Sequence, residues 1–283
     1  MNTHGQTITV KRCHGLGNVL MLLPVLYKLN DSGYRVRCVT RQPWASVLKV
    51  LCPGITFTTR NYADAVDLDV STADTMPRMH RADEYGEILG VAGPFPRHEL
   101  QVPESWKRPF REFRGAMIMA PEAGHPARQW PLKYWRRLGR LARHASPVFV
   151  GTRRDTPMPD GVDLRGMLSL AELVGLISQA NSVVCLDSGI LHLAAALDKP
   201  VVAIFGGVDP RFRTRAQPST IIVQAKLDCC PCNKNESCGG EYFCLHAITP
   251  EWLALQLEAL LCRQKRMNRV ANALDALTGT TAT

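Results

Sequence analysis

A short polar turn between an apolar run and an apolar helix-forming stretch is the part of this sequence best suited to chemistry. Asp187, Ser188 and Gly189 follow the apolar residues 182–186 and precede that stretch. A helix that begins here exposes backbone N–H groups and the positive end of its dipole, which attract anions. His192 lies one helical turn beyond Ser188, so both side chains can face the same ligand. This spacing predicts a site for a diphosphate.

A purely structural interpretation of the same turn is that Asp187 and Ser188 cap the helix while His192 packs in the core. The loops that follow other predicted strands favour the functional interpretation, in which the turn binds a ligand. Three further polar or glycine-containing segments follow predicted strands: 121–124, 151–155 and 206–209. In an open parallel sheet, the carboxyl ends of the strands line one crevice, where ligands bind. Four such loops therefore predict a single binding site.

Strands and helices alternate in both halves of the chain, which predicts parallel sheets covered by helices. The predicted strands are 7–11, 35–39, 66–70, 116–120, 147–150, 182–186 and 201–205. The predicted helices are 18–29, 43–51, 80–89, 132–145, 170–180 and 250–277. Ser169 and Glu172 have the spacing of a capping box at the start of the fifth helix, and Thr249 caps the last.

The chain has 283 residues, enough for two domains of ordinary size. Four prolines between 93 and 114 predict an extended connection between the halves. We therefore expect an N-terminal domain over 1–105, a linker over 106–115, a C-terminal domain over 116–262 and a basic helical tail over 263–283.

Thirty-four basic residues against 25 acidic ones give a net charge of +9. This balance favours anionic partners, although many enzymes are simply basic. The basic and aromatic run 106–114 could contact nucleic acid or form a solvated basic face, as could the arginines Arg211, Arg213 and Arg215. No apolar run is long enough to span a bilayer, and the first residues do not resemble a signal peptide, so we expect a cytoplasmic protein.

Ten cysteines in a chain without an export signal indicate thiols or metal ligands rather than disulfides. Four of them could form a structural zinc site: Cys229, Cys232, Cys238 and Cys244. The alternative is a loop of thiols that bind nothing, and the spacing does not decide between the two.

Several of these segments together resemble glycosyltransferase family 9, the heptosyltransferase-like enzymes. They are 15–20, 23–24, 128–131, 164–166, 187–192, 205–206, 209–210 and the cysteine-rich 229–244. The resemblance covers most of 11–252 and is more specific in the C-terminal half.

The resemblance implies an α/β fold of GT-B architecture, in which two Rossmann-like domains with parallel sheets face each other across a cleft. The N-terminal domain would bind the acceptor and the C-terminal domain a nucleotide-sugar donor, with an ADP-sugar such as ADP-heptose favoured. Transfer would be inverting and would need no metal or other cofactor. The implied acceptor is a saccharide or glycolipid of the lipopolysaccharide core type, which leaves room for peripheral contact with a membrane.

The implied donor-binding residues lie in two loops of the C-terminal half: Glu122, Ala123, Gly124, Arg128, Asp187, Ser188, Gly189 and His192. Arg128 occupies the position where the family typically carries a lysine. A guanidinium can bind phosphate oxygens in a bidentate manner, so the change keeps the charge but alters the geometry.

The N-terminal loop contains Gly15 and Gly17, which would let a substrate approach the backbone closely. Asn18 departs from the resemblance, because the family usually has an aspartate there, proposed to take the acceptor proton. An amide cannot act as a general base. The predicted catalytic residues are Asn18 and His14: either Asn18 only orients the acceptor hydroxyl, or a neighbour such as His14 takes its proton.

Two alternative functions remain open at this stage. One is a glycosyltransferase that acts on a modified base in DNA, as some viruses encode, which the positive charge would suit. The other is a non-catalytic nucleotide-sugar binding protein, which Asn18 suggests.

Overall fold

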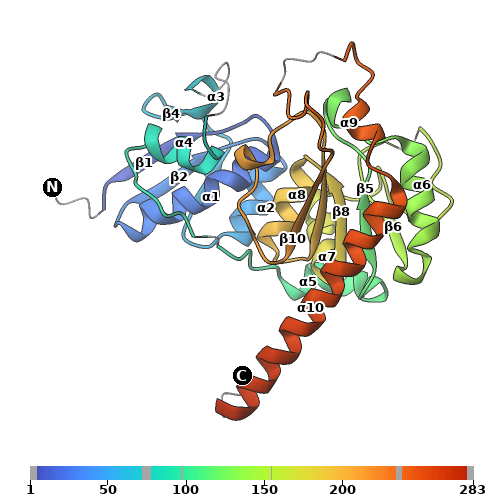
Figure 1. The fold of residues 1–283 in the computed structure, drawn as a ribbon. Helices are drawn as coiled ribbons and strands as arrows, with labels where there is room; N and C mark the ends of the chain where they lie inside the picture. Colours follow the sequence, from blue (N-terminus) through green and yellow to red (C-terminus); the bar gives the residue numbers. More distant parts are fainter. Residues whose placement is uncertain (1–4, 72–77, 97, 154, 234–237, 279–283) are drawn as a thin grey trace.

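The computed structural model describes residues 5–71, 78–96, 98–153, 155–233 and 238–278, which form two α/β units side by side (Figure 1). The first unit has a four-stranded parallel sheet of order β3-β2-β1-β4. Its strands are β1 (Thr7–Lys11), β2 (Arg35–Val39), β3 (Thr56–Thr58) and β4 (Val66–Asp67). Its helices are α1 (Leu16–Asp31), α2 (Trp44–Leu51), α3 (Leu68–Ser71) and α4 (Arg81–Ile88).

The second unit has a six-stranded parallel sheet of order β10-β9-β8-β5-β6-β7. Its strands are β5 (Met117–Ala120), β6 (Pro147–Phe149), β7 (Val162–Asp163), β8 (Ser182–Leu186), β9 (Val201–Phe205) and β10 (Thr220–Gln224). Its helices are α6 (Leu132–Leu141), α7 (Leu170–Gln179), α8 (Gly189–Ala196), α9 (Phe243–His246) and α10 (Pro250–Thr278). Two α/β units with parallel sheets are what the sequence predicts.

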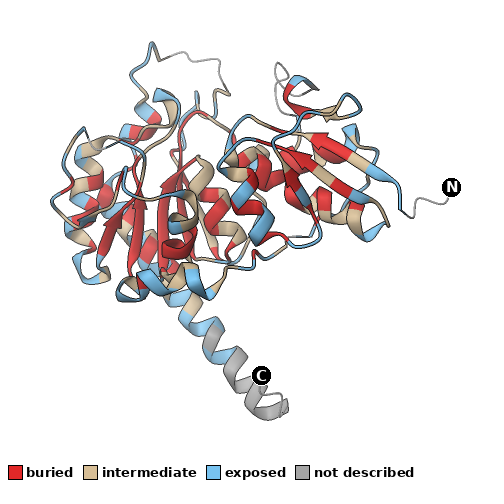
Figure 2. Cartoon of the chain, turned by 180° about the vertical axis from the view of Figure 1, so that it is seen from behind, coloured by how far each residue is buried: buried red, intermediate tan, exposed pale blue. Residues whose placement is uncertain are grey.

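The central strands of the second sheet are buried on both faces (Figure 2). Successive side chains on a strand point to opposite faces, so each strand contributes to two cores. Val183 and Cys185 of β8 join a core that extends through α1 into the first unit. Val184 and Leu186 join a second core beneath α6 and α10.

The two units meet where the first turns of α1 and α8 touch. A Cβ atom on Gly17 would lie 2.6 Å from His192 Cδ2 and 3.5 Å from Gly189 Cα. A Cβ atom on Gly189 would lie 3.6 Å from the Gly17 nitrogen. Gly17 therefore permits a helix–helix approach that a larger residue would disturb, whereas a Cβ atom on Gly189 would make only an ordinary contact.

The expectation of an extended linker is wrong for residues 104–113, which form α5 (Glu104–Lys107) and the 3₁₀ helix η1 (Arg108–Phe113). Pro103 precedes α5 and Pro109 lies in the first turn of η1, positions where the fixed φ of proline suits a helix start. Phe110 is buried, and the Trp106 backbone contacts Gly175 of α7. The aromatic residues of this segment are packed against the core, which removes the basis for base stacking there.

The predicted strand 66–70 is also too long, because β4 ends at Asp67. Asp67 Oδ1 accepts hydrogen bonds from the Asp69 and Val70 backbone nitrogens at 3.0 and 3.4 Å, and the chain turns into α3. The sequence missed the short strands β3 and β7 and also missed β10.

The predicted tail is continuous with the last helix, since α10 runs from Pro250 to Thr278 and projects from the body (Figure 1). The Trp252 backbone nitrogen donates to Thr249 Oγ1 at 3.2 Å, as the predicted cap requires. Within the described residues, no helix is long and apolar enough to cross a membrane.

Candidate active site

The connection order of the second sheet reverses between β5 and β8. From β5 the chain continues outward to β6 and β7, whereas β8 lies on the other side of β5 and leads to β9 and β10. The four predicted loops follow β5, β6, β8 and β9, so all lie at the carboxyl edge of one sheet. Ligands of open α/β sheets bind at such a reversal.

Two predicted donor residues meet at this reversal. Arg128 ends the 3₁₀ helix η2 (Pro126–Arg128) after β5, and Asp187 follows β8. Arg128 Nη1 lies 3.3 Å from the Asp187 carbonyl oxygen and 3.5 Å from its carboxylate Oδ2. Asp187 is 3% exposed and Arg128 is about one-third exposed, so a buried carboxylate holds a guanidinium that still reaches solvent.

Ser188 precedes α8, but its side chain makes no cap hydrogen bond. Its hydroxyl oxygen is buried and, among the described residues, has no hydrogen-bond partner. Asp187 Oδ2 likewise accepts no hydrogen bond there. Ser188 therefore does not cap the helix as the purely structural interpretation requires, although His192 packs against Gly17 as that interpretation expects. Polar groups without a partner at a helix start suit a ligand.

His192 lies on the first turns of α8 against Gly17. Burial, together with the positive charge of Arg213 and the neighbouring His80, lowers the pKa of His192 to about 3. The imidazole is therefore neutral at physiological pH and can donate or accept a hydrogen bond.

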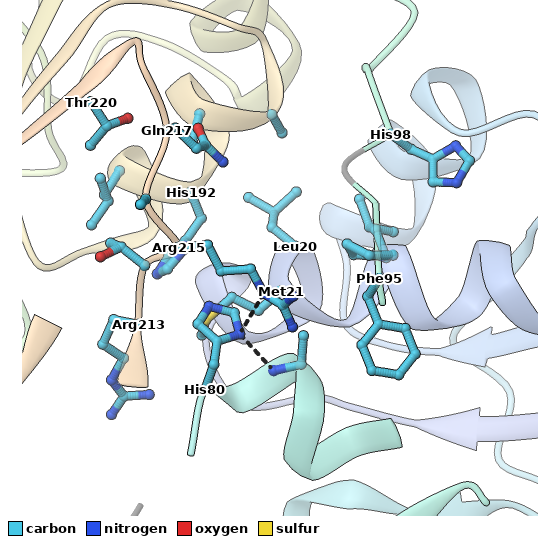
Figure 3. Close-up of a pocket in the computed structure, with 18 residues that line it drawn as sticks. Leu20, Met21, His80, Phe95, His98, His192, Arg213, Arg215, Gln217 and Thr220 are labelled. Carbon is cyan, nitrogen blue, oxygen red and sulfur yellow. Dashed lines mark hydrogen bonds between the residues drawn. The ribbon is translucent and has the colours of Figure 1, made fainter. Parts of the chain in front are cut away.

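A pocket of about 290 Å³ lies between α1 and α8, with His192, His80, Arg213 and Arg215 among its walls (Figure 3). Arg128 is not one of the pocket's lining residues; it lies beside Asp187 instead. Arg213 interacts electrostatically with both Asp187 and Arg128, so the pocket and the β8–α8 turn share one charged environment.

The first of the predicted donor loops has a different role at Glu122. Its carboxylate accepts hydrogen bonds from the Thr152 nitrogen and hydroxyl at 2.7 and 2.8 Å, and from the Arg153 nitrogen at 2.9 Å. Glu122 therefore holds the loop after β6. The Ala123 carbonyl accepts from Gln129 Nε2 at 2.6 Å, and a Cβ on Gly124 would meet no atom within 4 Å.

These residues line a second cavity, of about 550 Å³, at the carboxyl ends of β5 and β6. Its walls include Glu122, Trp130, Arg153 and Arg165. Pockets of this size accommodate small organic ligands.

The connection order of the first sheet reverses between β1 and β4, and Asp69 lies at that point. Asp69 Oδ1 accepts hydrogen bonds from Arg12 Nη1 at 2.9 Å and from the His14 nitrogen at 3.1 Å. Its Oδ2 accepts from the Cys13 nitrogen at 2.7 Å. Asp69 is 8% exposed, so this buried carboxylate fixes the loop between β1 and α1.

The predicted catalytic residues lie on that loop. His14 Nδ1 is 3.3 Å from Asp69 Oδ1, and 68% of the His14 side chain is exposed. Asn18 Nδ2 donates to the His14 carbonyl at 2.9 Å, so the amide braces the loop. Gly15 has φ of 75°, a conformation that favours glycine, and precedes α1.

The structure thus brings Gly17, which lies next to Asn18, against Gly189 and His192 of the second unit. Sequence reasoning missed Asp69 because it lay within a predicted strand. It also grouped Arg213 and Arg215 with a solvated basic face, which fits Arg211 alone, 85% exposed and paired with Asp209.

Arg215 instead connects the two units. Its Nη2 lies 2.6 Å from Asp83 Oδ1 of α4, and its Nε donates to His80 Nδ1 at 3.4 Å. Burial, together with the charge of Arg215, lowers the pKa of His80 to about 4.

The four cysteines of the candidate zinc site, which the sequence left undecided, lie near one another. Cys229, Cys232, Cys238 and Cys244 line one small cavity of about 20 Å³ beside Gly207. Within the described ranges, however, no three His, Cys, Asp or Glu side chains are arranged to hold a metal ion. Cys230, outside the predicted set, interacts with Cys244 and donates to the Gly206 carbonyl at 3.3 Å, and burial raises the pKa of both thiols.

Comparison with known proteins agrees with this architecture. Residues 85–242, more than half of the chain, match glycosyltransferase family 9 (heptosyltransferase). Lipooligosaccharide heptosyltransferase 2 of Haemophilus influenzae is 28% identical over 154 residues, which cover 49% of this chain and 44% of that protein. The chain thus matches less than half the length of this curated relative.

Two solved structures share the fold at low identity. A family 9 glycosyltransferase from Veillonella parvula has a TM-score of 0.73 at 17% identity and covers 93% of this chain and 99% of its own. The iron-containing dodecameric glycosyltransferase TibC from Escherichia coli has a TM-score of 0.72 at 18% identity, over 93% of this chain and 77% of its own. TibC has also been solved with ADP-D-β-D-heptose.

The predicted GT-B architecture of two Rossmann-like domains is therefore confirmed, and the chain belongs to glycosyltransferase family 9.

Proposed function

We propose that this chain transfers a sugar from a nucleoside diphosphate donor to the hydroxyl group of an acceptor. The observation that carries the proposal is the contact between Arg128 and Asp187 at the reversal of the second sheet. Beside it lie the unpartnered Ser188 hydroxyl and the start of α8, and the first turn of α1 faces them.

Departure of the nucleoside diphosphate leaves growing negative charge on the phosphate that was bonded to the sugar. Donors that already point at that charge stabilise the transition state, because no reorganisation is needed when the bond breaks. The Arg128 guanidinium, the Ser188 hydroxyl and the N-terminal end of α8 supply such donors. Asp187 holds Arg128 in position.

The acceptor hydroxyl must lose its proton as it attacks, and we assign that proton to His14. The Asp69 carboxylate lies 3.3 Å from His14 Nδ1 and would orient the ring. Asn18 supports the loop through the His14 carbonyl. Because base and leaving-group donors come from opposite units, attack on the face opposite the departing diphosphate inverts the anomeric centre.

For the donor we favour ADP-heptose, and for the acceptor a saccharide or glycolipid of the lipopolysaccharide core, approached from peripheral contact with a membrane. The heptosyltransferase relative and the ADP-heptose complex of TibC support this choice. The leaving-group charge is met here by arginine and helix N–H groups, so we assign no catalytic step to a metal ion. A DNA acceptor loses its support with the packing of Trp106 and Phe110 against the core.

The experiment is a thermal-shift screen of the full chain with ADP-, UDP- and GDP-sugars, followed by transfer assays with the stabilising donor and core saccharides. A ligand at 100 times its Kd stabilises by about 2.7 kcal/mol, which shifts the melting temperature measurably. Transfer of the sugar with inversion supports the proposal. Tight nucleotide binding with neither transfer nor donor hydrolysis would select a non-catalytic binding protein instead.

A further inference from the structure

Three arginines follow β9 at alternate positions, and each has a different environment. Arg211, in the 3₁₀ helix η4 (Pro210–Phe212), points to solvent and pairs with Asp209 at 2.6 Å. Arg215 pairs with Asp83 of the first unit. Arg213 lies between them in sequence and turns into the molecule.

Arg213 lines the pocket between α1 and α8 together with His192 and His80 (Figure 3). Its Nε is buried and, in the part of the chain that the structure describes, has no hydrogen-bond partner. Its electrostatic neighbours are the carboxylate of Asp187, which attracts it, and the guanidinium groups of Arg81 and Arg128, which repel it.

This environment is unfavourable for a cation without a further anion. Burial disfavours the charged guanidinium and lowers the pKa of Arg213, and the attraction of Asp187 is shared with Arg128. A buried donor with no partner costs free energy unless a ligand satisfies it. The pattern indicates an anion with more than one negative charge between the two arginines.

Strand order places the two arginines on opposite sides of the Asp187–Ser188 turn. Arg128 follows β5 and Arg213 follows β9, and β8 lies between these strands. Neighbouring strands are about 4.8 Å apart, so the two loops begin about 10 Å apart, a gap that two arginine side chains can close around a diphosphate.

The same order gives the diphosphate a direction. The cavity of about 550 Å³ that is large enough for a nucleoside lies at β5 and β6. Along the sheet edge the sequence of features is this cavity, Arg128, the Asp187–Ser188 turn and Arg213. A nucleotide with its nucleoside in the cavity therefore extends its second phosphate toward β9.

We propose that Arg213 is the guanidinium that binds the sugar-linked phosphate of the donor, opposite Arg128, and so stabilises the departing diphosphate. This inference rests on the proposed function and adds a leaving-group contact to it.

The test is isothermal titration of the full chain with ADP and with AMP, which lacks the second phosphate. Arg213→Gln keeps much of the side-chain length but removes the charge. Hydrogen bonds to charged groups contribute roughly 1.5–3 kcal/mol, so we expect Arg213→Gln to weaken ADP binding about 10- to 100-fold and AMP binding less than about 3-fold. Arg211→Gln, the matched control two residues away, should bind both nucleotides as the wild type does.

Arg213→Lys provides a second variant that retains the charge, and circular dichroism checks its fold. It should show an intermediate loss for ADP, because an ammonium cannot reproduce the guanidinium fork. Wild-type ADP affinity in both variants overturns the inference, as does an equal loss for ADP and AMP, which would indicate a structural role. If the wild-type chain binds none of ADP, UDP and GDP, the proposed function fails as well.

Discussion

The two sheets reverse their connection order at equivalent points, but the buried polar groups there differ in how far the protein itself supplies their hydrogen bonds. At the β1–β4 reversal, Asp69 accepts hydrogen bonds from Arg12 and from the nitrogens of Cys13 and His14. At the β5–β8 reversal, Arg128 Nη1 lies 3.3 Å from the Asp187 carbonyl oxygen and 3.5 Å from its carboxylate, and the Ser188 hydroxyl has no partner among the described residues.

This difference indicates that the reversal in the first sheet fixes a loop, whereas the reversal in the second sheet leaves groups available for a ligand. A carboxylate whose oxygens are satisfied by its own unit fixes a loop rigidly, and that loop carries His14 and Asn18. Buried polar groups that stay unsatisfied in the protein are costly unless something else satisfies them. The N-terminal reversal therefore positions a side chain, and the C-terminal one is arranged to receive an anion.

We expect the largest effect of any single substitution, a loss of kcat, at His14, and this variant is therefore the strongest test of the comparison. His14→Ala should lower kcat about 100- to 10,000-fold, the usual contribution of a general base, while ADP affinity stays unchanged. Steady-state kinetics and titration measure the two. The exposed His144 provides the control, since His144→Ala should leave both values unchanged. Wild-type turnover in His14→Ala would remove His14 from the mechanism.

Asp69→Asn tests the structural side of the comparison. Removing one partner of a buried charge pair costs about 3–5 kcal/mol, so urea unfolding should show a loss of stability of that order. The exposed Asp64 is the matched control, and Asp64→Asn should change stability by less than about 0.5 kcal/mol. Equal stability of the two variants would contradict the role given to Asp69.

Arg128→Gln tests the proposed anion-binding reversal of the second sheet. It should lower kcat/KM about 100- to 1,000-fold, as the loss of one preorganised donor usually does, with little change in stability. Arg137, exposed and paired with Glu251, offers a control with the same substitution. If Arg128→Gln unfolded the protein at much lower urea but kept its kcat/KM, the two reversals would have exchanged roles.

The pH dependence of stability sharpens the comparison at His192, which faces both units. Its pKa is lowered to about 3 in the folded protein and should be near 6.5 when unfolded, so the unfolded chain binds more protons in between. The stabilising contribution of the neutral His192 is fully present above about pH 6.5 and decreases as the pH falls from about 6.5 toward 3. Melting temperatures between pH 7 and 4.5 should decline less steeply in His192→Gln, and an unchanged slope would show that His192 is not buried as a neutral ring.

The smallest expected effect concerns metal ions. Because arginines and helix N–H groups meet the leaving-group charge in our proposal, turnover should be unchanged within about twofold after dialysis against EDTA. Loss of turnover that Mg²⁺ or Mn²⁺ restores would show that the C-terminal reversal needs a cation that its own residues do not supply.

Much of the fold could be predicted from local patterns. The apolar strands β8 and β9 were predicted with their observed bounds. The capping box at Ser169 and Glu172 forms as predicted, with both reciprocal hydrogen bonds present. Prolines misled the prediction at 104–113, because proline in a first helical turn and proline in an extended segment look alike in sequence.

The candidate site was only half predictable, for a related reason. Asp187 was proposed because loops after parallel strands share an edge, His192 because of its helical spacing from Ser188, and Arg128 because of the family resemblance. The role of Glu122 could not be foreseen, since its carboxylate is occupied by a loop about 30 residues away. Nor could the sequence tell that Arg213 turns inward while Arg211 stays in solvent.

The sequence by itself determined the alternation of strands and helices and the polar loops that follow the strands, because side-chain periodicity and helix starts depend on neighbouring residues. Only the tertiary structure decided that Asp69 fixes the His14 loop, that Gly17 meets His192, and that Arg213 buries its Nε within the electrostatic reach of Asp187. Those contacts depend on the order of strands within each sheet and on the packing of α1 against α8, which join residues far apart in the chain.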